Sequence, residues 1–122
     1  MSNRLSSFAL LIALALGNAH AHGIGAPKHG GTVSAAAGMS FELVADADGT
    51  SIYIEDHDLP VAPTGLSGKL SMLAGGEKAE AELVAVGPRL LARGFKVGPG
   101  SIVVAVLQNA AGQSLTVRFV QR

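Results

Sequence analysis

Histidine is the residue type in this sequence with the clearest chemical potential, and there are four: His20, His22, His29 and His57. Imidazole is the most common metal ligand in proteins, and carboxylates are oxygen donors that suit divalent ions. His57 lies in the run Glu55-Asp56-His57-Asp58, where four candidate donors follow one another. These residue types predict metal binding rather than any other chemistry.

The acidic run around His57 supports two interpretations. In an extended segment neighbouring side chains point to opposite sides, so only two or three of these donors can meet one ion unless the backbone turns. Leu59-Pro60 indicates such a turn directly afterwards. The first interpretation is a metal site at this turn. The second is a solvated acidic turn in which His57 bonds to the backbone.

The glycine-rich segment His22–Gly31 carries two of the histidines and is expected to form a flexible arm (22–31). If the chain is cleaved after Ala21, His22 offers its α-amine and ring nitrogen as a chelating pair. Together with His29 this makes a nitrogen-rich site that favours Cu(II). The alternative is a solvated tail whose histidines bind nothing.

The N-terminus has the features of a secretory signal peptide (1–21). Arg4 precedes an apolar run from Phe8 to Leu16, and Ala19-His20-Ala21 supplies an A-x-A cleavage site; cleavage after Ala19 is the alternative. The run is too short to span a bilayer, which takes roughly 20 apolar residues. We therefore expect a mature chain that is exported to the periplasm and does not insert into the membrane.

Composition excludes several classes of function. The chain has no cysteine, so disulfides, cysteine-type metal sites and thiol nucleophiles are excluded. Lys+Arg 9 balance Asp+Glu 9, and tryptophan is absent, which argues against a nucleic-acid partner. No serine lies in a nucleophile-elbow pattern, and the glycine pairs do not lead into a helix as phosphate loops do. We therefore expect no enzyme.

Period-two alternation dominates the rest of the chain and predicts an all-β fold. Residues 32–122 are expected to form a small antiparallel sandwich of seven or eight strands, roughly immunoglobulin-like, with an open barrel as the alternative. Glu77–Val86 has helix-forming composition, but its alanines alternate and predict a strand. The apolar run Ile102–Leu107 is expected to be buried on both faces. The expected bulky core residues are Phe41, Phe95 and Phe119.

Several segments together resemble small periplasmic β-domain proteins associated with heavy-metal cation efflux systems. They are also similar to the N-terminal His-containing β domain of some efflux periplasmic adaptor subunits. The segments are Ala26–Val33, Phe41–Val44, Tyr53–Val61, Gly68–Leu70 and Thr116–Phe119. The resemblance implies that His29 and His57 contact a metal with Asp56 nearby. The chain lacks the helical hairpin and lipoyl-like parts of an adaptor, which implies a free-standing binding or delivery role.

Two hypotheses follow. The first is a non-enzymatic periplasmic accessory protein that sequesters or delivers copper, zinc or another divalent cation, linked to heavy-metal efflux. Its metal ligands would be His29, His57 and His22, with Asp56 as a further donor or as an acceptor that orients a ring. Its partners would be the ion and periplasmic components of a cation efflux pump. The second is a metal-free interaction module that docks a partner by β-strand addition.

Overall fold

The computed structural model describes residues 25–122, which form nine β-strands. The expected signal peptide, His20 and His22 lie outside the described residues. No helix in the described part of the chain is long and apolar enough to cross a membrane. The strands are β1 (Thr32–Ala36), β2 (Met39–Asp46), β3 (Gly49–Asp56), β4 (Leu59–Val61), β5 (Ser67–Ala74), β6 (Glu77–Val86), β7 (Arg89–Arg93), β8 (Ile102–Gln108) and β9 (Ser114–Val120).

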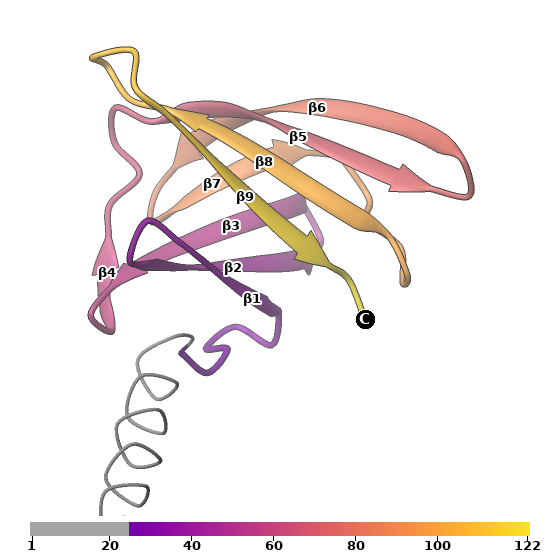
Figure 1. Cartoon of the computed structure of the whole chain (residues 1–122), viewed down its shortest axis with the longest axis horizontal. Coiled ribbons are helices and arrows are strands. Elements are labelled where there is room, and N and C mark those ends of the chain that lie inside the picture. Colours follow the sequence, from indigo (N-terminus) through magenta and orange to yellow (C-terminus); the bar gives the residue numbers. More distant parts are fainter. Residues whose placement is uncertain (1–24) are drawn as a thin grey trace, which may run out of the picture.

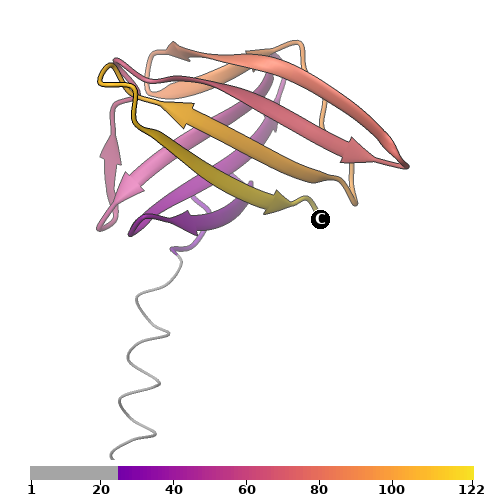
Figure 2. The ribbon, with the colours of Figure 1, turned by 45° about the horizontal axis from the view of Figure 1, so that its top comes forward.

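The strands form one antiparallel sheet in the order β1-β2-β3-β7-β6-β5-β8-β9, with β4 added to the end of β3. Strand β6 joins the two halves: Glu77–Leu83 pairs with β5, and Val84–Val86 pairs with β7. Because one continuous strand takes part in both halves, the sheet turns a corner at β6 and curls into a barrel-like shape (Figures 1 and 2).

The all-β antiparallel class is confirmed, and so is the strand at Glu77–Val86. The strands number nine, and they curl toward the barrel that the sequence left as the alternative to two stacked sheets. The barrel is not closed by a backbone ladder in the described residues. Instead Ser34 Oγ donates to the Arg118 carbonyl at 2.7 Å, and Thr32 Oγ1 donates to Gln121 Oε1 at 3.1 Å, which links β1 to β9.

The interior is filled by the inward side chains of every long strand, as the period-two pattern requires. Phe41 and Phe119 are almost completely buried. Phe95, in the segment after β7, is partly buried and packs against the core cluster. The prediction for Ile102–Leu107 is wrong on one face. Val103, Ala105 and Leu107 are buried, but Val106 is 39% exposed, because the curled sheet is a single layer and nothing in the described chain covers the outer face of β8.

Candidate functional site

The segment Lys28–Gly31 wraps around the carboxylate of Glu42. The backbone N–H of Lys28 donates to Glu42 Oε1 at 3.0 Å, and those of His29 and Gly31 each donate to Oε2 at 2.8 Å. Glu42 belongs to the outward row of β2, between the Phe41 and Leu43 side chains that point into the core. It is nevertheless only 6% exposed, because this segment covers it. The start of the described chain is therefore fastened to the barrel wall.

The two glycines after His29 allow this wrap. A Cβ on Gly31 would lie 2.2 Å from the Leu43 carbonyl oxygen, so any side chain there would push the segment off β2. Gly30 has φ of 72°, in the left-handed region that glycine adopts without steric cost. The Lys-His-Gly-Gly sequence thus has a local explanation: it brings successive N–H groups onto one carboxylate.

Glu42 stays ionised in this setting. Burial by itself raises the pKa of a carboxyl group, but the hydrogen bond from the His29 ring and those from the backbone of Gly31, His29 and Lys28 together hold the pKa of Glu42 below its usual value. Hydrogen bonds to a charged acceptor contribute about 1.5–3 kcal/mol each. The carboxylate is therefore the anchor of the segment.

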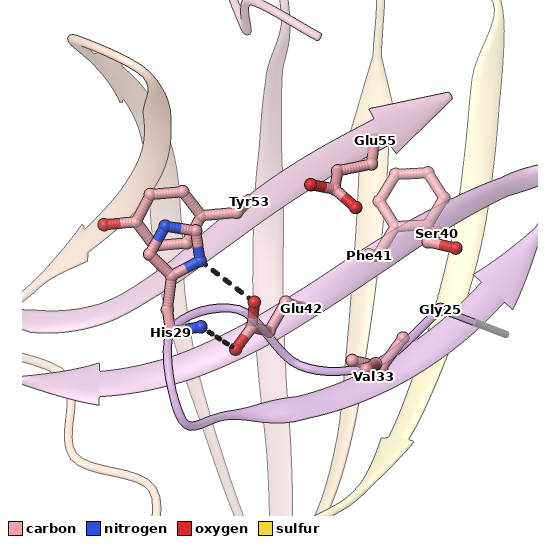
Figure 3. A pocket seen from close by; sticks show the side chains of 9 residues that line it. Gly25, His29, Val33, Ser40, Phe41, Glu42, Tyr53 and Glu55 are labelled. Carbon is pink, nitrogen blue, oxygen red and sulfur yellow. Dashed lines mark hydrogen bonds and ion pairs between the residues drawn. The ribbon is translucent and has the colours of Figure 1, made fainter. Parts of the chain in front are cut away.

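The ring of His29 is held on two sides (Figure 3). Its Nδ1 lies 3.0 Å from Glu42 Oε1, and the ring stacks on Tyr53 with centroids 3.7 Å apart and planes at 8°. An ionised carboxylate only accepts hydrogen bonds, so Nδ1 carries the proton and a neutral ring presents the Nε2 lone pair. The side chain is 42% exposed, and no described residue hydrogen-bonds to Nε2. His29 is thus an oriented nitrogen donor.

Lys28 extends the contact toward the next turn. Its Nζ forms an ion pair with Glu55 Oε2 at 2.7 Å and donates to the Asp58 carbonyl at 3.2 Å. The hydrogen bond to Glu55 raises the pKa of Lys28, so the ammonium keeps its charge. Gly25 lies beside the same turn, since a Cβ there would be 3.6 Å from Asp58 Oδ1. The described arm therefore runs from the β3–β4 turn to the middle of β2.

His57 lies in the two-residue β3–β4 turn with Asp58, and the φ angles of these two residues are 52° and 66°. Its Nδ1 is 2.7 Å from Asp56 Oδ1. The His57 side chain is 90% exposed, so this pair is held by far fewer contacts than the His29 pair. Asp56 is thus positioned to accept a hydrogen bond from this ring nitrogen, and its role toward a metal ion stays a prediction.

The His29 ring lies against Tyr53 of β3, and His57 follows the end of the same strand. The structure does not bring the two rings into one cluster. His29 stacks on Tyr53, which is separated from His57 by up to about 13 Å of extended chain. Lys28 and Glu55 lie between them. Within residues 25–122 no three His, Asp or Glu side chains converge in a way that could hold a metal ion. The described chain therefore offers two separate imidazole–carboxylate pairs.

A small hollow lies beside His29, between the arm and the outer face of β2 and β3. It measures about 10 Å³ and is lined by His29, Glu42, Tyr53 and Glu55, among others (Figure 3). That volume corresponds to about one water molecule. The hollow can hold a water or an ion, but not an organic substrate.

Sequence reasoning missed Glu42 and Tyr53. It counted Glu55 among the donors of the acidic run but did not place it beside His29. Glu42 and Tyr53 are direct cross-strand partners on the outer face, and Glu55 lies on the same face two residues further along β3. The available signal was the alternation of β2 and β3, which places all three side chains outward, beside the arm that carries Lys28 and His29.

No model of a protein family, no curated protein and no solved structure matches this chain.

Replacing Glu42 with Gln should release the arm. The neutral side chain keeps its size but presents an NH₂ group to N–H donors, which removes charge-assisted bonds worth more than 1.4 kcal/mol, or tenfold in the docking equilibrium. We expect trypsin to cleave after Lys28 at least tenfold faster in Glu42→Gln than in the wild type. Glu80→Gln, at an exposed acid on β6, is the matched control and should cleave at the wild-type rate. Equal rates in all three proteins would show that Glu42 does not hold the arm.

Acid should release the arm in the same way. A carboxyl whose folded-state pKa is lowered stabilises the fold above its unfolded pKa of about 4.3, and this contribution is lost as pH falls through the lower folded value. Tyr53 is the single tyrosine and tryptophan is absent, so tyrosine fluorescence reports on the stacked His29 ring. We expect a transition below about pH 4 in the wild type that is missing in Glu42→Gln. The same transition in Glu42→Gln, or its absence from the wild type, would contradict the assignment to Glu42.

Proposed function

We propose that this protein is a non-enzymatic metal-binding accessory protein, exported to the periplasm, that sequesters or delivers copper or zinc in connection with heavy-metal efflux. The observation that carries the proposal is the His29 ring, whose Nδ1 is bonded to the buried carboxylate of Glu42. The resemblance of the chain to efflux-associated periplasmic β domains supports the same assignment and supplies the proposed compartment and partner.

The His29 pair has the arrangement found around metal-ligating histidines. Such rings commonly donate one N–H to a carboxylate, which fixes the tautomer and makes the other nitrogen a better donor. Here the buried, ionised Glu42 and the stacked Tyr53 together hold the ring in one orientation. Neither contact uses Nε2. The His29 side chain is 42% exposed, which leaves the ring accessible to an ion from solvent.

The β3–β4 turn offers a second, separate set of ligands. His57 repeats the imidazole–carboxylate pairing with Asp56. Gly25 lies beside Asp58, and a chain processed at His22 would begin three residues before Gly25. A processed N-terminus at His22 would add an α-amine and an imidazole within reach of His57. The nitrogen-rich ligand set favours Cu(II) and also suits Zn(II).

The small number of preformed ligands in the described chain favours a transfer role. A structural zinc site is closed by four protein ligands, whereas the described chain offers imidazoles one at a time on its surface. An ion held by one or two imidazoles keeps open coordination positions, through which a receiving protein can capture it. This favours delivery or short-term sequestration over permanent storage.

The second candidate is a metal-free module that docks a partner by β-strand addition, and the seam between β1 and β9 favours it. The two strands face one another with side-chain bonds and no backbone ladder in the described residues. Strand edges without a ladder are sites where an added strand can pair. Capture of a periplasmic partner that is unaffected by chelator would favour this function over metal binding.

Titration calorimetry with Cu(II) and Zn(II) tests the metal assignment. We expect the mature chain to bind one of these ions with Kd below about 10 µM, or −6.8 kcal/mol. His29→Ala should weaken binding at least tenfold, and Glu42→Gln by 10- to 100-fold, since the orienting carboxylate is lost. His57→Ala should affect only ions bound at the separate β3–β4 turn pair, and Lys69→Ala on the distant strand β5 should leave binding unchanged. Binding weaker than 10 µM, or full affinity in His29→Ala, would contradict the proposal.

A further inference from the structure

One end of the barrel opens into an apolar cavity of about 380 Å³. It lies where β2 begins, β3 and β8 end and β9 begins, at the end of the barrel that carries β4 and the β8–β9 hairpin (Figure 1). Apolar side chains form its floor and its rim. The floor consists of the buried Phe41, Ile54 and Leu107, and the rim of the partly exposed Met39, Leu66 and Leu115.

The opposite end of the barrel is covered. The chain after β7 folds back there, with Phe95 and Val97 packed against the core. The buried Thr50 fixes this cover, because its Oγ1 donates to the Phe95 carbonyl at 2.7 Å. Since Thr50 is at the start of β3 and Ile54 near its end, the cover and the cavity lie at opposite ends of the same strand. In the described residues, the barrel is therefore covered at this end and has its apolar cavity at the other.

The chemistry of the cavity selects its ligand. Among residues 25–122, no Asp, Glu, Lys, Arg or His side chain lines it, and its polar groups come from Gln108, Asn109, Gln113 and Ser114 on the β8–β9 side. Asn109 and Gln113 already bond to one another, with Nδ2 to Oε1 at 2.9 Å. A charged ligand would lose its hydration without gaining an opposite charge, which is costly in an apolar site. A neutral ligand with an amide-compatible polar group meets no such cost.

We propose that this mouth is a binding site for a small, uncharged, mainly apolar molecule. The cavity volume is within the 300–1,000 Å³ range of ligand pockets, and barrel mouths are a frequent location for them. At the packing density of protein interiors it accepts on the order of 15 non-hydrogen atoms. The apolar body of the ligand contacts Phe41, Leu107 and Leu115, and its polar group faces the Gln108 amide. The His29 site lies on the outer face of β2 and β3 and shares only Phe41 with the lining of this cavity.

Fluorescence titration with the neutral probe N-phenyl-1-naphthylamine tests this site. We expect saturable binding of one equivalent to the wild type, displacement by 1-decanol, and displacement by decanoate only at tenfold or higher concentration. Met39→Trp fills the mouth and should weaken probe binding at least tenfold. Val106→Trp, at an exposed position on the outer face of β8, is the matched control and should bind the probe as the wild type does. Chelator should have no effect, which separates this result from the fate of the metal site.

Three outcomes would overturn the proposal: binding that does not saturate at one equivalent, equal binding by Met39→Trp and Val106→Trp, or equal displacement by decanol and decanoate. Leu66→Trp, on the loop that leads into β5, fills the mouth from the other side. It provides a second filling variant if urea unfolding shows that Met39→Trp does not fold. Retention of the probe by a folded Leu66→Trp protein would count against the site in the same way.

Discussion

The carboxylate of Glu42 is the interaction on which the candidate site depends. It lies on the outer wall of the barrel, yet it is buried, because three backbone N–H groups and one imidazole of a single short segment are bonded to it. An unpaired carboxylate in that position would be costly, so the segment and the acid stabilise each other. One residue thereby holds the arm on the barrel and sets the protonation of the His29 ring.

The barrel wall provides the rigid frame for this arrangement. Glu42 and Tyr53 are directly paired across β2 and β3, so the acceptor for the ring nitrogen and the platform under the ring are set at a fixed spacing. The inward neighbours of Glu42, Phe41 and Leu43, are buried in the core and hold β2 in register. Changes that loosen this hairpin would therefore disturb the orientation of His29.

Much of the fold follows from local patterns. Alternation predicted the all-β class, Phe41 and Phe119 were correctly predicted in the core, and the strand at Glu77–Val86 was predicted against its composition. The curling into a barrel was not decided, because it depends on β6 pairing with different strands at its two ends. Ile102–Leu107 was expected to be covered on both sides, but a hydrophobic run does not reveal how many layers a fold has. His29 was found by residue type, whereas Glu42 looked like an ordinary outward acid, since its partners are backbone groups 11 to 14 residues away.

The central claim is that Glu42 keeps the proton of His29 on Nδ1 and leaves Nε2 free for a metal ion. Nitrogen-15 NMR of the histidine rings during titration with Zn(II) measures this directly. The account predicts that His29 of the unliganded protein is the Nδ1–H tautomer, that zinc shifts its Nε2 resonance, and that Glu42→Gln loses the tautomer preference. A proton on Nε2 in the wild type, or an Nε2 resonance that does not respond to excess zinc, would contradict it.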